Sequence, residues 1–249
     1  MSGELIQSDH GLASSLAQHG PADIAWLSPD EYRRWLGHAT ELVERATWEG
    51  ARNVEVTDRM RHTIAAHAGL IVAGFEPHTH PYRNVVAIVI HLGTIVTRGP
   101  ERGADGLHSD APRYLAGQAG HHRDPLVLDW RTLRREMRTP HYGQNVVYHE
   151  FAHKLDALDG DADGMPPLPT RDARELWDQT MGTNFRRLRR RRHPLVRQYG
   201  ATNPAEYFAV VSELFFTRPL DLRAHLPRVY DRLAEFYLQD PAERGPRET

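Results

Sequence analysis

The segment NVVYHEFAHKLD, residues 145–156, restricts the fold of this chain more than any other part of the sequence. Its valine, phenylalanine, alanine and leucine residues follow a helical pattern and predict a helix that is buried or half buried. The same helix carries His149 and His153, which are four residues apart and therefore project from one side. Any fold that contains this helix has to provide partners for two polar rings in or near its core.

His149, Glu150 and His153 form the H-E-x-x-H signature of zinc peptidases. Two imidazoles on one side of a helix can bind a single zinc ion, and Glu150 borders that side in the position of a general base. The alternative is a pair of core histidines with ordinary hydrogen-bond partners. We favour the metal site, because a composition-weighted search of a chain this long expects only about 0.06 chance matches to the motif.

The composition limits the ligands and partners of such a site. The chain has 249 residues and no cysteine, so zinc has to bind through nitrogen and oxygen atoms. A formal net charge of -2 gives no overall attraction to nucleic acid or to an anionic membrane. There is no secretory leader and no apolar run of about 18 residues. We therefore expect a cytoplasmic protein that has no membrane association.

The pattern of apolar and turn residues predicts one α+β domain at residues 25–240, between a loose N-terminal arm, residues 1–24, and a flexible C-terminal tail, residues 241–249. A small sheet would pack against the H-E-x-x-H helix, and the C-terminal part would be helical. The expected helices lie at 29–46, from 57, at 146–156, from 171, at 204–216 and at 220–238. Strands are expected at 85–92, as an inner strand, and at 125–130, and long loops at 98–124 and 158–169.

Arginines crowd the segment RRLRRRRH, residues 186–193. Such a run is usually a solvated helix face or loop. Nucleic-acid binding is the alternative, but no aromatic pattern or fold signature accompanies the run. We therefore do not expect nucleic acid to be a partner.

A catalytic zinc ion normally has three protein ligands and an open position, so the two histidines need a third partner. Asp156 lies one turn beyond His153 and is better placed to orient an imidazole or to cap the helix end. Glu206 and Glu213 are seven residues apart on one helix face, and either side chain could turn toward the zinc. Glu206 also fits a capping box that begins at Asn203, so the residues alone leave this choice open.

A family resemblance resolves the choice. HEFAHKLD, NPAEYFAVVSELFF, IAAHAGLIV and DPLVLDW together resemble the Mlc titration factor A family of zinc peptidases, over roughly residues 25–240. The stretch from Tyr199 to Phe208 also resembles the second zinc segment of the lethal-factor group, which are gluzincin-type peptidases. These resemblances imply that Glu206 is the third zinc ligand and that Tyr199 donates a hydrogen bond to the oxyanion.

The resemblance implies an aminopeptidase-like zinc metallopeptidase that acts on short peptides and also binds a transcriptional repressor of sugar uptake. Two imidazoles and one carboxylate make a complete catalytic ligand set, so we expect one zinc per chain. The strand at 125–130 would pair with an extended substrate. Two alternatives remain: a repressor-binding regulatory protein whose zinc is mainly structural, and a non-peptide metal hydrolase such as an amidase. The sequence departs from better-known members of the family in the loop around 100–123 and in the arginine run, which affects the predicted partner more than the chemistry.

Overall fold

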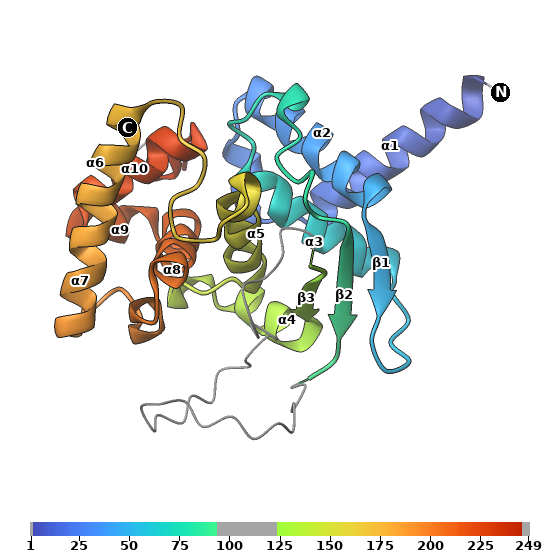
Figure 1. Ribbon diagram of the computed structural model, residues 1–249. Helices are drawn as coiled ribbons and strands as arrows, with labels where there is room; N and C mark the ends of the chain where they lie inside the picture. Colours follow the sequence, from blue (N-terminus) through green and yellow to red (C-terminus); the bar gives the residue numbers. More distant parts are fainter. Residues whose placement is uncertain (1, 94–123, 246–249) are drawn as a thin grey trace.

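The computed structural model describes residues 2–93 and 124–245, with side chains from residue 11 onward. Helix α5, Val146–Asp156, is the predicted H-E-x-x-H helix and lies between the sheet and the C-terminal helices (Figure 1). Its apolar residues Val147, Phe151 and Leu155 are fully buried. The helix packs against α3 (Asp58–Ile71), α8 (Pro204–Thr217) and β3 (Leu126–Asp129), so the prediction of a buried helix is confirmed.

The sheet has three parallel strands in the order β1-β2-β3: β1 is Thr47–Gly50, β2 is Ala87–His91 and β3 is Leu126–Asp129. The apolar segment around β2 forms the central strand, as predicted. Strand β1 was not predicted, because it is short and mostly exposed. The described part of the chain is therefore mostly helical with one small sheet, which agrees with the predicted α+β class.

Helices α1, Ser2–His19, α2, Pro29–Arg45, and α3, Asp58–Ile71, pack together beside the sheet (Figure 1). Ser28 and Glu31 form the predicted capping box of α2. Helix α1 differs from the predicted loose arm. Its fully buried Leu16 belongs to the core, so packing against the neighbouring helices gives this polar sequence the partners that a free arm lacks.

The C-terminal part is helical, as predicted, and its long central helix α8, Pro204–Thr217, packs against α5. The expected helix at 220–238 is in fact two helices, α9 and α10, because the ring of Pro227 cannot continue a helix. Helix α4, Trp130–Arg138, precedes α5. The other helices of the C-terminal part are α6, Arg171–Trp177, α7, Thr183–Arg190, α9, Pro219–His225, and α10, Pro227–Tyr237.

Short helical segments complete the described chain. A π-helical turn, Asp178–Gly182, joins α6 to α7. The 3-10 segments are Ala22–Trp26, Pro77–Thr79, Pro140–Tyr142, Ala157–Asp159, Gln198–Ala201 and Pro241–Glu243. Pro241 is buried and Arg244 pairs with Glu31 at 2.8 Å, so the start of the predicted tail is packed against the domain.

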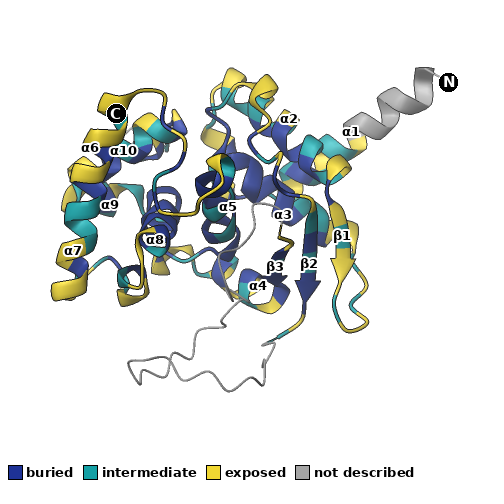
Figure 2. Cartoon of the chain, viewed as in Figure 1, coloured by how far each residue is buried: buried dark blue, intermediate teal, exposed yellow. Residues whose placement is uncertain are grey.

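Two predictions concern surface segments. The arginines of α7 and the residues after it are exposed at the edge of the molecule, as expected of a solvated face (Figure 2). The predicted loop at 98–124 lies outside the described residues except for its last position. Within the described ranges, no helix combines the length and the apolar character that a membrane-spanning segment requires.

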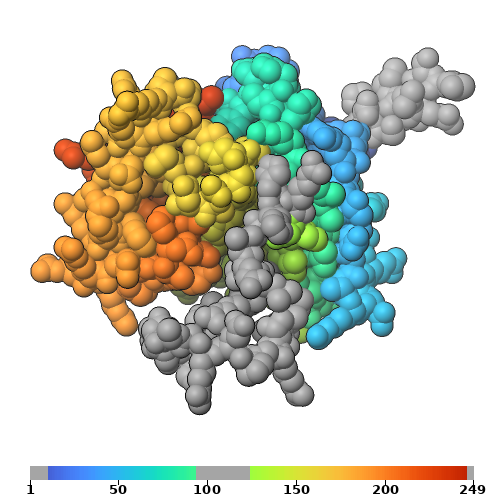
Figure 3. Space-filling view, viewed as in Figure 1, coloured from blue at the N-terminus to red at the C-terminus, as the bar shows by residue number. Residues whose placement is uncertain are grey.

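The segment that follows α5 ties this helix to the start of α8. Gly164 donates its amide hydrogen to Asp156 Oδ2 at 2.8 Å and accepts a hydrogen bond from Trp177 Nε1 at 2.8 Å. Its φ is +86°, and an added Cβ would lie 2.5 Å from the carbonyl oxygen of Pro204. The segment, coloured yellow, covers the surface between the N-terminal and C-terminal parts (Figure 3).

Candidate metal centre

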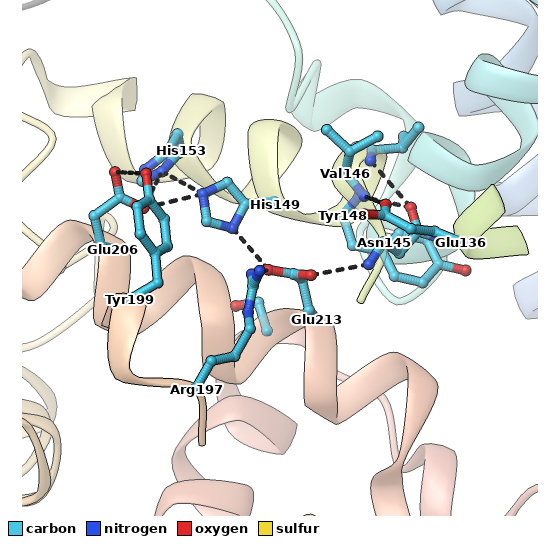
Figure 4. Close-up of polar contacts among 12 residues, drawn as sticks. Glu136, Asn145, Val146, Tyr148, His149, His153, Arg197, Tyr199, Glu206 and Glu213 are labelled. Carbon is cyan, nitrogen blue, oxygen red and sulfur yellow. Dashed lines mark hydrogen bonds and ion pairs between the residues drawn. The ribbon is translucent and has the colours of Figure 1, made fainter. Parts of the chain in front are cut away.

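Side chains from α5 and α8 bring three ligand atoms to one point (Figure 4). The Nε2 atoms of His149 and His153 are 3.2 Å apart. Glu206 Oε2 lies 3.0 Å from the first of these nitrogens and 3.5 Å from the second. All three atoms fall within 4.8 Å of one another, which makes His149, His153 and Glu206 a candidate metal centre.

The position of Glu206 follows from the cap of α8. Asn203 Oδ1 accepts a hydrogen bond from the Glu206 amide at 2.9 Å, so the N-cap is present. The reciprocal half of a capping box is absent from the described contacts, because the Glu206 carboxylate turns toward α5. The capping alternative is therefore half right: Asn203 caps the helix, and the side chain of Glu206 remains available.

The electrostatics of the three groups favour a cation. Glu206 Oε2 is buried and has no hydrogen bond of acceptable geometry, although it faces two imidazole nitrogens. Burial disfavours the imidazolium, but contacts with Glu206 and Glu213 outweigh that effect and raise the pKa of His149 to about 10. Burial acts against the charge of Glu206 as well, yet the two histidines lower its pKa. A metal ion would satisfy the unpaired oxygen and supply the positive charge that the surroundings favour.

Glu213 lies on the opposite side of the His149 ring. Its Oε1 atom is 2.7 Å from His149 Nδ1 and also accepts a hydrogen bond from Arg197. Its Oε2 atom accepts a hydrogen bond from the Asn145 amide at 2.8 Å. Glu213 is 1% exposed, and both of its oxygens are paired. The structure therefore places Glu206, and not Glu213, where the two Nε2 atoms converge.

We call the two sides of His149 the outer side and the inner side. The outer side consists of His153, Glu206 and Tyr199, and the inner side of Asn145, Arg197 and Glu213. Arg197 had no signal in the sequence that could have identified it as part of the site. Glu213 was noticed through its spacing from Glu206, but its contact with Nδ1 depends on how α5 and α8 pack.

Tyr199 belongs to the outer side, and Glu150, which precedes it along the chain on α5, borders that side. The Tyr199 hydroxyl donates to Glu206 Oε1 at 3.0 Å, and the side chain is 38% exposed. Burial and the nearby Glu206 raise the pKa of Tyr199, so its hydroxyl stays protonated at neutral pH. Glu150 follows His149 on α5, and burial raises the pKa of its carboxyl despite the opposing effect of both histidines. Tyr199 therefore contacts the candidate ligand Glu206, and Glu150 lies close enough to both histidines for their charges to lower its pKa.

Asp156 does not have the predicted role of orienting an imidazole. It is fully buried at the C-terminal end of α5, where Oδ2 holds the Gly164 amide. Its Oδ1 has no hydrogen bond, and burial raises the pKa of the carboxyl to about 7. The prediction was wrong because sequence spacing does not reveal that the loop after α5 folds back over this end of the helix. Glu213 contacts the imidazole instead.

The chain is similar to known proteins over most of its length. The model of the glucose-regulated metallo-peptidase M90 family matches residues 10–238, and the chain therefore belongs to this metallopeptidase family. Similar proteins include Mlc titration factor A of Edwardsiella ictaluri, 31% identical over 232 residues, which are 89% of this chain and 85% of that protein. Mlc titration factor A of Serratia proteamaculans is 30% identical over 246 residues, 94% of this chain and 92% of that protein.

An uncharacterized protein of Synechocystis is 27% identical over 221 residues, which are 87% of this chain and 80% of that protein. Together these matches confirm the resemblance to the Mlc titration factor A family. A metallopeptidase family implies a bound metal, and the group of His149, His153 and Glu206 is a candidate site for it.

Proposed function

We propose that this protein is a zinc-dependent peptidase of the gluzincin type, in which His149, His153 and Glu206 hold one zinc ion per chain. The observation that carries the proposal is the buried Glu206 Oε2, which lacks a hydrogen bond and faces two Nε2 atoms. Two imidazoles, one carboxylate and an open position form a common ligand set for catalytic zinc. Without cysteine, a softer ligand set is not available to this chain.

When bound, zinc would act as a Lewis acid that polarises the peptide carbonyl and makes water a stronger acid. Glu150 takes the proton of the attacking water and later passes it to the leaving amine. Its raised pKa suits this role, because a more basic carboxylate is a better proton acceptor. The Tyr199 hydroxyl, which donates a hydrogen bond to Glu206 in the structure, donates instead to the developing oxyanion. The side chain is partly exposed and therefore has room to make this change.

The proposed substrates are short peptides, with an aminopeptidase-like preference, and the proposed location is the cytoplasm. An extended peptide would add to the sheet beside β3, which is the last strand in the described order. A peptide-library digest tests the activity and the end preference together. We expect cleavage by the zinc-loaded wild type and almost none by Glu150→Gln. Amide hydrolysis without any peptide cleavage would favour the amidase alternative.

A second candidate function is the binding of a transcriptional repressor, which the name of the related Mlc titration factor A proteins favours. In this alternative the zinc is mainly structural, and the protein acts through the repressor. Glu150→Gln separates the two functions, because it preserves the shape of the site while removing the base. Tight repressor binding by wild type and variant alike, together with no peptidase activity in the wild type, would favour the regulatory role.

A further inference from the structure

Glu213 holds the ring nitrogen of His149 that faces away from the candidate metal centre. We infer that Glu213 is a positioning residue, which fixes the tautomer and the orientation of His149 so that Nε2 is presented to a metal ion. This inference rests on the proposed metal centre and extends it to the inner side. Carboxylates that accept a hydrogen bond from a metal-binding histidine commonly set both properties.

The tautomer follows from the hydrogen bonds of the Glu213 carboxylate. An ionised carboxylate only accepts hydrogen bonds, so His149 Nδ1 has to carry the hydrogen in their 2.7 Å contact. In the neutral ring, Nε2 then has a free lone pair. Arg197 donates to the same carboxylate and provides the positive charge that a buried anion needs. These contacts thus keep a hydrogen on Nδ1, so that a metal ion binding His149 takes the place of a hydrogen on Nε2 alone.

The orientation follows from the second oxygen of Glu213. Oε2 accepts the hydrogen bond of the Asn145 amide, at the start of α5, while Oε1 holds a ring one turn further along the same helix. One side chain from α8 therefore holds both the backbone and a metal-facing ring of α5. Glu206 belongs to α8 as well, so the Glu213 contacts help to keep ligands from the two helices in register.

A purely structural role would make Glu213 equivalent to Glu136, which provides a matched control. Glu136, on α4, is also a buried carboxylate, and it accepts a 2.7 Å hydrogen bond from the amide of Val146 at the start of α5. It makes no hydrogen bond with either histidine among the described residues. If Glu213 only stabilises the helix, substitutions at both positions should affect metal binding equally.

The test compares Glu213→Gln with Glu136→Gln by zinc competition against a chromogenic chelator. Glutamine at position 213 is neutral and a weaker acceptor for Nδ1–H than the carboxylate, and where its NH2 group faces Nδ1 it favours the tautomer with hydrogen on Nε2, the atom that faces the proposed metal. We expect zinc affinity to fall by about 10 to 100-fold in Glu213→Gln. In Glu136→Gln it should stay within about threefold of wild type, because an amide oxygen can still accept the Val146 hydrogen bond.

The second readout is the proton NMR signal of His149 Nδ1, which a hydrogen bond to a carboxylate shifts strongly downfield. It should be present in the wild type and in Glu136→Gln, with or without zinc, and lost or shifted upfield in Glu213→Gln. If Glu213→Gln does not fold because Arg197 is left unpaired, the double variant Arg197→Met/Glu213→Gln removes both charges and carries the same expectations.

Three outcomes would contradict different parts of the argument. Wild-type zinc affinity in folded Glu213→Gln, or an unchanged Nδ1 signal, would overturn the positioning role and leave the proposed metal centre intact. Equal losses of affinity in both variants would assign Glu213 a structural role alone. A wild-type protein that binds no zinc would instead contradict the proposed function, together with the affinity part of this inference.

Discussion

The two sides of His149 use the same kind of group in different ways. On the inner side, Glu213 is almost fully buried and both of its oxygens have protein partners. On the outer side, Glu206 has one oxygen that accepts a hydrogen bond from Tyr199 and one that is buried, has no hydrogen bond and lies 3.0 and 3.5 Å from two imidazole nitrogens. A carboxylate whose two oxygens both have protein hydrogen bonds has no free position for a cation. A carboxylate with one oxygen that lacks a hydrogen bond and lies beside two imidazole nitrogens can bind one.

The largest expected effect tests this comparison directly. Glu206→Ala removes a proposed ligand, so zinc affinity should fall by on the order of 10³-fold or more, beyond the losses typical of residues that only orient a ligand. Glu213→Ala should still contain close to one zinc per chain after metal-replete purification. Elemental analysis measures both. If Glu213→Ala lost its zinc and Glu206→Ala kept it, the roles of the two sides would be reversed.

Glu150→Gln separates metal binding from catalysis on the outer side. The Glu150 carboxylate makes no hydrogen bond with another described residue, so the substitution should leave zinc content and thermal stability unchanged. Turnover should fall by about 10² to 10⁴-fold, because the amide cannot accept the proton of water. Steady-state kinetics on a peptide identified in the library digest gives the answer. Near wild-type turnover would rule out this type of mechanism.

Tyr199→Phe measures how much the Tyr199 hydroxyl, on the outer side, contributes to turnover. Loss of the hydroxyl should lower kcat by about 10² to 10³-fold while KM and zinc content change little, as expected for a donor that acts in the transition state. A loss below about threefold would assign Tyr199 to packing. Lower thermal stability or missing zinc in the variant would show that its hydrogen bond to Glu206 supports the site and not the reaction.

Asp156 also has a buried carboxylate oxygen without a hydrogen bond, Oδ1, and here the result is a raised pKa. Its pKa of about 7 in the folded protein is above the ordinary value of 3.8, so the folded state binds the proton more tightly. The resulting stabilisation is complete below about pH 4 and is lost as the pH rises through 7. Asp156→Asn should therefore gain stability relative to wild type, on the order of 2 kcal/mol, when denaturation is measured at pH 8 instead of pH 5. An equal difference at both pH values would mean that ionisation of Asp156 costs nothing.

The sequence predicted those elements that depend on residues close to one another along the chain. The H-E-x-x-H helix, the capping box at Ser28 and the inner strand near Val89 each depend on residues within one turn or one strand, and each is present in the structure. The sequence did not predict the helix that contains Leu16, because only contact with distant residues stabilises it. Nor did it separate α9 from α10, although Pro227 marked the break.

In the candidate site, too, the sequence predicts the features that depend on nearby residues and misses those that depend on contacts between distant segments. The spacing of His149 and His153 placed both rings on one side of a helix, and family resemblance selected Glu206. Hydrogen bonds across α5 and α8 determine the inner side, and no spacing within either segment predicts that Arg197 meets Glu213. The role of Asp156 could not be predicted, because it depends on a loop that turns back over the end of α5.

That loop also limits which residue the chain can carry at position 164. Gly164 adopts a left-handed conformation and forms hydrogen bonds with both Asp156 and Trp177. It lies against the backbone of Pro204, where an added Cβ would be 2.5 Å from the carbonyl oxygen. Any side chain would push the first turn of α8 away from the end of α5. Since that turn carries Glu206, a larger residue at position 164 would also move the Glu206 carboxylate relative to the two imidazoles of α5.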